Sequence, residues 1–291
     1  MRICSLLPSA SEIVAALGHS DSLVGVSDEC RWPPEVRSKP VVTAARIDPS
    51  ELTSLEIDEA VRASVLDGRS LYALDAELVA ELRPDLVITQ DLCAVCAVSG
   101  GDVASALPLD VEVLSLDPRT LAEVVETFRV LARRLGTPER GEELADEFQG
   151  TIAGVADAVR GLPTRRVFFA EWLDPPFCAG HWIPEMIELA GGEDELGQPG
   201  LPSRSTTWEE GLAQQPELVV LAPCGFGAEE ALRRASGLSF DCPAVAVDGD
   251  GYYACPGPRL ADGVRQLGHL FHPEAVDDPG LPALDLGAAV R

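Results

Sequence analysis

The chain has 291 residues, 46% of them hydrophobic and 24% charged, which is ordinary usage for a globular protein and argues against disorder. Its formal net charge is −26, so phosphate backbones and anionic membrane surfaces would repel the protein. We therefore expect no nucleic-acid partner. No apolar run approaches the roughly 20 residues needed to span a bilayer, which predicts no membrane insertion.

Short apolar runs alternate with helical patterns along most of the chain. Most runs are rich in Leu or in β-branched residues and are apolar throughout, which is typical of parallel strands covered on both faces. Strands that alternate with helices favour an α/β fold with parallel sheets. The expected strands are Arg2–Leu7, Leu23–Ser27, Asp85–Thr89, Glu112–Leu116, Arg166–Glu171, Leu218–Leu221 and Ala244–Val247.

Several helix ends carry residues with known capping preferences. Ser9 and Glu12 have the spacing of a capping box, in which a hydroxyl and a carboxylate three residues later satisfy backbone N–H groups. Asp75 is placed to cap a second helix, and Gly191 to close a third. The helices so expected span residues 13–17, 76–82 and 183–190.

The middle of the chain lacks strand signals. Two helical patterns, 121–135 and 140–159, follow each other across a Gly136-Thr137-Pro138 break. The pattern therefore predicts two α/β halves joined by a helical connector. The expected domains are an N-terminal α/β lobe at 1–118, the connector at 119–162, a C-terminal α/β lobe at 163–275 and a tail at 276–291.

A weak internal repeat supports two similar halves. Residues 81–88 and 214–220 each run from a helix end through a proline and an acidic residue into an apolar strand. Glu77 and Glu209 both lie seven residues before the proline of their half. Such junctions recur in α/β proteins, so the repeat alone is weak evidence for two lobes. The helical connector between the halves is the stronger evidence.

The unusual residues gather in loops that follow the expected strands, where ligands bind in open parallel sheets. Six of the eight cysteines and most Trp and Tyr residues lie there, as a pocket for a bulky planar ligand requires. Cys93 and Cys96 have metal or redox spacing, although buried free cysteines are also common. His181 fits either a ligand contact or a bond to a loop carbonyl. The candidate metal ligands are Cys30, Cys93, Cys96 and Cys224.

Enzyme motifs are scarce. The sequence has no Gly-x-Ser-x-Gly, no P-loop and no Gly-x-Gly-x-x-Gly. A nucleophile pair of Cys178 with His181 lacks an obvious orienting partner. We therefore expect a protein that performs no catalysis.

Several segments match one family, the periplasmic-type binding proteins with a helical backbone. The matching segments include 5–12, 23–27 with the Trp32-Pro33-Pro34 that follows, 84–88, 174–177 with Gly180, 190–192 and Pro258-Arg259. Over roughly residues 1–272 the chain resembles these substrate-binding proteins of ABC importers, and especially those that bind cobalamin.

The resemblance implies two Rossmann-like lobes with parallel sheets, joined by a long rigid helix within 140–161, with a ligand cleft between the lobes. It implies non-catalytic binding of a cobalamin-type corrinoid or a related metal chelate, in an ABC importer or in intracellular corrinoid handling. Trp32 and Phe177 match aromatic cleft positions of the family, and Tyr252 and Tyr72 fall at or next to others. With two loop residues added, the expected ligand-binding residues are Trp32, Tyr72, Phe177, His181, Trp182 and Tyr252.

Two further expectations concern partners and alternatives. In the resembled importers one acidic residue on each lobe docks to the membrane permease, and Glu77 and Glu209 match those positions. The alternative function is a metal or iron–sulfur protein on the same scaffold, with zinc or a cluster held by the four loop cysteines. The N-terminus lacks a signal-peptide pattern, so we expect a cytoplasmic chain as numbered, or an extracytoplasmic one if a signal was removed.

Overall fold

The computed structural model describes residues 1–67, 70–90 and 111–287 and divides into two compact units. The N-terminal unit holds residues 1–52, 56–118 and 124–145, and the C-terminal unit holds 53–55, 119–123 and 146–291. The expected domain boundaries at residues 118, 162 and 275 stay predictions. No helix among the described residues is long and apolar enough to cross a membrane.

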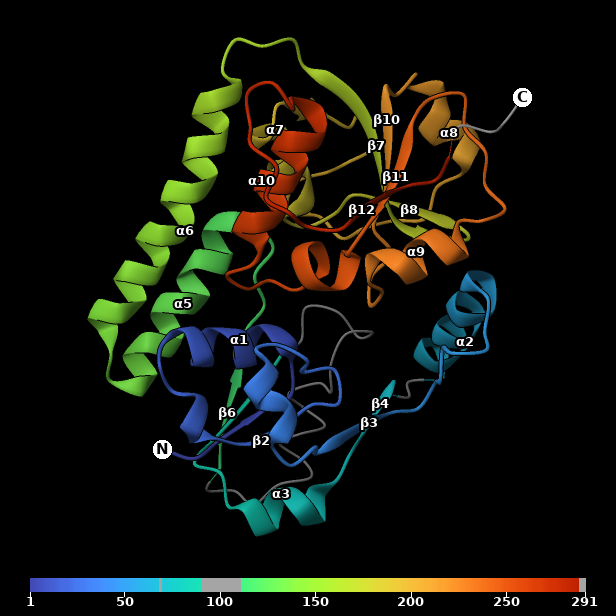
Figure 1. Ribbon diagram of the computed structural model, residues 1–291. Coiled ribbons are helices and arrows are strands. Elements are labelled where there is room, and N and C mark those ends of the chain that lie inside the picture. Colours follow the sequence, from blue (N-terminus) through green and yellow to red (C-terminus); the bar gives the residue numbers. More distant parts are fainter. Residues whose placement is uncertain (68–69, 91–110, 288–291) are drawn as a thin grey trace. The chain divides into compact units, whose positions relative to one another are not determined.

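The N-terminal unit is built on a four-stranded parallel sheet (Figure 1). Its strand order is β2-β1-β5-β6, and Ile3, Cys4, Val87 and Ile88 of the two central strands are fully buried. This burial explains why the strands read as apolar throughout. The strands are β1 (Ile3–Ser5), β2 (Leu23–Val26), β5 (Leu86–Thr89) and β6 (Glu112–Ser115).

One helix start was expected wrongly. Helix α1 spans Pro8–Ala16, with Leu7 as its N-cap residue and no side-chain cap. Pro8 takes the first helical position because it has no N–H to leave unpaired there. Ser9 and Glu12 are therefore buried inside the helix, and the expected capping box is not formed. In α3 (Ala76–Leu82) the expectation is confirmed, because the Asp75 carboxylate accepts the Leu78 N–H at 2.9 Å.

The segment between β2 and α3 holds elements that the sequence analysis did not expect. An antiparallel pair, β3 (Thr43–Ala45) and β4 (Tyr72–Leu74), flanks helix α2 (Ser54–Leu66). Short 3-10 turns occupy Ser20–Ser22 and Pro34–Ser38. The two central helices were expected and are present as α5 (Leu121–Leu135) and α6 (Pro138–Val159). Residues of α6 belong to both units.

The C-terminal unit contains a second sheet, in the order β12-β11-β10-β7-β8. Its three central strands are parallel, whereas β8 and β12 at the edges are antiparallel and the short β9 pairs with the start of β7. Strand β12 lies inside the segment expected to be a tail. The strands are β7 (Arg165–Leu173), β8 (Pro176–Cys178), β9 (Gly192–Glu193), β10 (Leu218–Leu221), β11 (Ala244–Val247) and β12 (Ala283–Asp285).

Helices cover both faces of this second sheet (Figure 1). Helices α8 (Trp208–Ala213) and α9 (Ala228–Arg234) pack against the face that carries Phe168 and Ala170. Phe169 points to the other face, toward Tyr253 in the π-helical turn Asp250–Ala254. Helices α7 (Ile183–Leu189) and α10 (Leu260–Phe271) pack against each other, and Gly191 follows α7 with a φ of +82° as expected.

The internal repeat corresponds to equivalent topology in the two units. Helix α3 leads into β5, which lies between β1 and β6, and helix α8 leads into β10, which lies between β7 and β11. In each unit the helix–proline–strand junction thus leads into a central parallel strand of the sheet. The expected α/β fold with parallel-sheet lobes is confirmed.

Candidate functional site

Three loops come together at the carboxyl edge of the C-terminal sheet. The Cys224 N–H donates to the Glu171 carbonyl oxygen at 3.0 Å, which joins the loop after β10 to the end of β7. The Asp250 N–H donates to the Phe226 carbonyl oxygen at 3.2 Å, which joins the loop after β11 to the loop after β10. The rings of Trp172 and Phe226 lie 5.8 Å apart. The loops after β7, β10 and β11 are therefore neighbours at this edge, where ligands bind in open parallel sheets.

His181 and Trp182 lie beside this edge, between β8 and α7. The Gly180 N–H donates to Glu171 Oε1 at 2.5 Å, which fixes the chain just before His181. Trp182 is only 4% exposed, and its Nε1–H donates to the Tyr253 carbonyl oxygen at 2.8 Å. The indole of Trp182 thus packs inside the unit and joins the His181 loop to the loop that carries Tyr252. Its direct contact with a ligand stays a prediction.

A segment that the sequence pattern did not predict holds His181 in place. Residues 198–206, here the strap, run alongside residues 176–181. The His181 N–H donates to the Leu201 carbonyl oxygen at 2.6 Å, and the Gly200 N–H donates back to the His181 carbonyl oxygen at 2.8 Å. These bonds hold His181 at a φ of +49°, which is uncommon outside glycine.

The His181 ring lies against Trp182, with centroids 5.6 Å apart. Its Nε2 is enclosed and has no hydrogen-bond partner among the described residues. Burial lowers the pKa of His181, and the nearby Arg119 guanidinium lowers it further, so the imidazole is neutral at pH 7. The sequence pattern does not point to Arg119, because it lies in the connector, far in sequence from the strand-end loops.

Tyr252 and Phe177 complete the aromatic residues of this edge. Tyr252 is half-buried, and the Arg259 guanidinium lies 5.3 Å from its ring centroid, in the range of a cation–π contact. Phe177 is half-buried in β8 and pairs with Trp172 of β7. Both residues thus keep part of their surface exposed.

In the N-terminal unit the two predicted aromatic residues differ in exposure. Trp32, in the loop after β2, is 45% exposed. Tyr72 opens β4 opposite Ala45 and packs against the buried cluster around Cys4. The Asp28 carboxylate ties the loop after β2 to β3, because it accepts from the Thr43 hydroxyl at 2.5 Å and from the Ala45 N–H at 2.8 Å.

The four candidate metal ligands are not shown as a cluster. Cys30 is buried, with its Sγ 3.1 Å from Ser11 Oγ, and burial raises its pKa to about 11, so it is a thiol at pH 7. Cys224 is exposed. Cys93 and Cys96 lie outside the described residues. Within the described ranges no group of three or more His, Cys, Asp or Glu residues is placed to hold a metal ion. Joint coordination by these cysteines stays a prediction.

Glu77 and Glu209 occupy equivalent helix positions. Each is the second residue of its helix, α3 or α8, and each is exposed. Their helices are capped alike, because Asp75 accepts the Leu78 N–H and Thr207 accepts the Glu210 N–H. The repeat therefore places one exposed carboxylate at the same point of each unit.

Comparison with known families decides the class of protein. A family model described as periplasmic binding protein matches residues 3–240, more than half of the chain. The chain belongs to that family. It is a substrate-binding protein of the ABC-importer type, which confirms the expectation of a binding protein rather than an enzyme.

Relatives of known structure or name extend along most of the chain. The vitamin B12-binding proteins of Vibrio cholerae and Salmonella typhimurium are each 24% identical to it over 91% of its length, and the matches cover 87% and 88% of those relatives. The periplasmic heme-binding protein of Roseiflexus sp. RS-1 in apo form is 24% identical, with a TM-score of 0.68 over 94% of this chain and 98% of that one. The vitamin B12-binding protein of Vibrio cholerae is 21% identical as a solved structure, with a TM-score of 0.63 over 92% and 94% of the two chains. The structural likenesses show the fold.

Proposed function

We propose that the chain binds a cobalamin-type corrinoid, or a related metal chelate, without performing chemistry on it. One observation carries this proposal: curated relatives that match 91% of the chain are vitamin B12-binding proteins. The aromatic residues at the strand-end loops support it, because aromatic faces suit a large planar macrocycle. The ligand contacts we propose are Trp32, Tyr72, Phe177, His181, Trp182 and Tyr252.

Visible spectra test the proposal, because solved relatives of the same fold are described as heme-binding. The purified protein is titrated separately with cyanocobalamin and with haemin, while ligand absorbance and tryptophan fluorescence are followed. Saturable binding of cyanocobalamin supports the proposal. Binding of haemin without binding of cyanocobalamin would mean that the ligand is heme and not a corrinoid. Anaerobic purification with metal analysis addresses the cysteine alternative, since a brown iron–sulfur spectrum or stoichiometric zinc would overturn the corrinoid proposal.

Replacing Trp32 by alanine is expected to weaken cyanocobalamin binding by about 1–3 kcal/mol, because an aromatic face is withdrawn from the ligand. Trp32 is partly exposed, so the substitution leaves the core intact. Isothermal titration calorimetry gives the affinity. Trp32→Phe should keep most of it, and Leu66→Ala, at an 87% exposed position of α2, serves as the control. Equal affinities of Trp32→Ala and the unchanged protein would remove Trp32 from the site.

We also propose that Glu77 and Glu209 dock to an ABC-transporter permease. Reversing both charges to Lys is expected to abolish ligand uptake in cells while ligand binding by the purified protein is unchanged, because both side chains are exposed. Glu139→Lys is a matched control, since Glu139 is also the exposed second residue of a helix, α6. Normal uptake by the double variant would rule out docking through this pair.

A further inference from the structure

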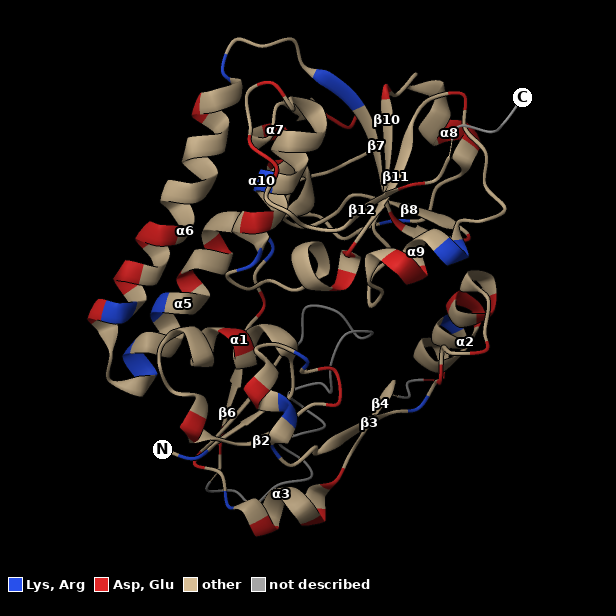
Figure 2. Ribbon diagram, in the orientation of Figure 1, with Lys and Arg blue, Asp and Glu red and all other residues tan. Residues whose placement is uncertain are grey.

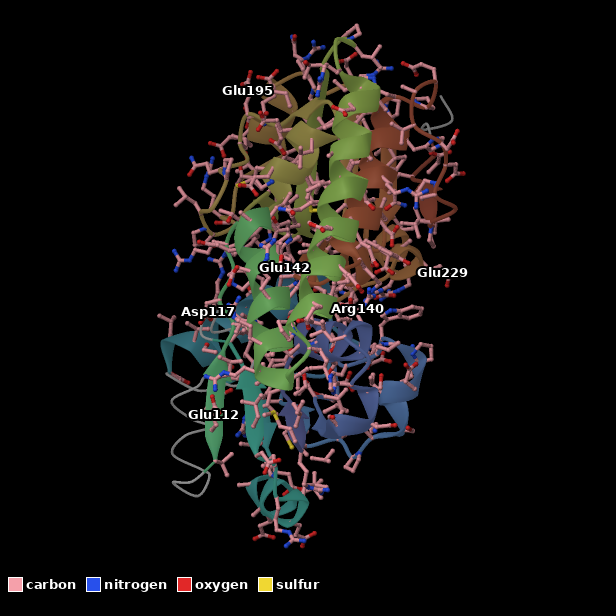
Figure 3. The ribbon with its side chains drawn as sticks, turned by 90° about the vertical axis from the view of Figure 1, so that its left-hand side faces the viewer. Glu112, Asp117, Arg140, Glu142, Glu195 and Glu229 are labelled. Atoms are coloured by element: carbon pink, nitrogen blue, oxygen red, sulfur yellow. The ribbon has the colours of Figure 1, made fainter. Side chains whose placement is uncertain are left out.

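Arg119 is one of several arginines of this chain, Arg37 and Arg204 among them, that form no ion pair with the described residues. The chain has 48 acidic and 22 basic residues, and acidic positions are spread over the helices of both units (Figure 2). Because acidic residues are so numerous, many arginines form an ion pair with a carboxylate. On α5, Arg129 pairs with Glu142 of α6 at 2.8 Å, and Arg134 pairs with Glu112 of β6 at 2.6 Å (Figure 3 labels both acids). Arg119 is exposed and forms no ion pair with any described residue.

Within the described part of the chain, Arg119 has no acidic partner although carboxylates lie close by. Glu123 Oε2 accepts the Arg119 N–H at 2.6 Å and the Thr120 N–H at 3.2 Å. Glu185 Oε2 accepts the Leu121 N–H at 2.7 Å. Both carboxylates are thus directed to backbone N–H groups at the start of α5, where a carboxylate is also favoured by the helix dipole. The Arg119 guanidinium remains available for a different anion.

His181 lies near this guanidinium. Arg119 is close enough to lower the pKa of the imidazole, after the larger effect of burial. A β-carbon at Gly200, which donates to the His181 carbonyl oxygen, would lie 3.7 Å from Thr120 Cγ2. The start of α5, the strap and His181 are therefore neighbours within the C-terminal unit.

We propose that Arg119 and His181 together bind an anionic group, a carboxylate or a phosphate, that projects from the ligand. The guanidinium supplies two parallel N–H donors that match either oxyanion. The neutral imidazole supplies a third donor through Nδ1, because Nε2 is enclosed. Because the chain carries a net charge of −26, an anionic ligand is not attracted by the overall electrostatic field and needs a local cation, here the Arg119 guanidinium. This inference rests on the proposed function, and it narrows the ligand to macrocycles with a pendant anion.

Two ligand pairs test which anion is recognised. Cyanocobalamin carries a phosphodiester that cobinamide lacks, and haemin carries two carboxylates that its dimethyl ester masks. The unchanged protein is expected to prefer the anionic member of the pair it binds by about tenfold, since a charge-assisted hydrogen bond contributes at least that much. Cobinamide also lacks the rest of the nucleotide loop, so a preference within the first pair identifies a phosphate only where Arg119→Gln abolishes it. A preference within the second pair identifies a carboxylate.

Three variants connect the preference to these residues. Arg119→Gln and His181→Asn should each abolish the tenfold preference, and asparagine is chosen because it tolerates a positive φ. Arg160→Gln, which removes an equal charge from the exposed Arg160–Asp157 pair, should keep the preference. Equal binding of both members by the unchanged protein, or a preference kept by Arg119→Gln, would overturn the anion site while leaving the corrinoid proposal intact.

A probe without any macrocycle separates the two proposals. The chain has only four histidines, so the imidazole signal of His181 can be assigned by NMR with the His181→Asn variant. Titration with inorganic phosphate and with acetate should shift this signal in the unchanged protein and not in Arg119→Gln. If no macrocycle binds but the signal shifts, the proposed function fails and the anion site stands. An unmoved signal together with no preference between ligands contradicts the site.

Discussion

Replacing Gly180 by alanine is expected to lower the free energy of unfolding by about 3 kcal/mol, the upper range for overpacking a filled interior. A β-carbon at Gly180 would overlap Ser203 N, and would lie 2.6 Å from Ser203 Cα and 2.9 Å from Pro202 C. These are backbone atoms, so no side-chain rotation can relieve the clash, and the strap must move away. The hydrogen bonds that the strap makes to Cys178 and His181 would then be lost.

Chemical denaturation measures this effect, and Gly150→Ala in α6 provides a matched control. A β-carbon at Gly150 has nothing within 4 Å, and alanine is favoured over glycine inside a helix by about 0.5–1 kcal/mol. The same substitution should therefore stabilise the protein at one position and destabilise it at the other. A Gly180→Ala variant as stable as the unchanged protein would show that the strap does not pack against Gly180 as described.

The sequence predicted the central strands because parallel strands covered on both faces must be apolar along their length. All seven expected strands are present, although most are shorter than expected. The strands that were missed, β3, β4, β8, β9 and β12, have two or three residues each, too few for a periodic pattern. The capping box at Ser9 failed for a local reason, since Pro8 already occupies the first turn of α1.

The sequence predicts candidate site residues where their place in a strand-end loop is enough to identify them. It does not predict residues that are brought to the site only by tertiary contacts. His181 and Tyr252 are candidate site residues because they follow strands of one sheet, and their contact with a ligand stays a prediction. The strap was missed because its polar, proline-containing sequence has no period of its own, and it is ordered by hydrogen bonds to residues 176–181. For Cys30, the residue type suggested a metal ligand, whereas burial makes it a thiol that resists losing its proton.

The buried carboxyl group of Asp194 is expected to make the free energy of unfolding depend on pH, with a loss of stability as the pH rises through about 6. Burial raises the pKa of its carboxyl group to about 6, although hydrogen bonds from backbone N–H groups oppose the shift. Its two oxygens accept from the Phe169 N–H at 2.9 Å and the Leu196 N–H at 3.0 Å. In the unfolded chain the carboxyl group has its ordinary pKa of 3.8. The folded state therefore binds the proton more tightly, and this contribution is complete below about pH 4 and lost above about pH 6.

Comparison with Asp194→Asn isolates this contribution, because the variant has no titrating group at that position. Between pH 7 and about pH 4.5 the unchanged protein should gain about 2 kcal/mol of stability relative to the variant, given 1.36 kcal/mol for each pKa unit. Glu217 and Glu230, whose pKa values are lowered by backbone and arginine partners, act in the opposite direction but are present in both proteins and cancel. Unfolding free energies measured in urea across this range give the difference directly. Parallel curves for the two proteins would mean that the Asp194 carboxyl group is not buried as the structure has it.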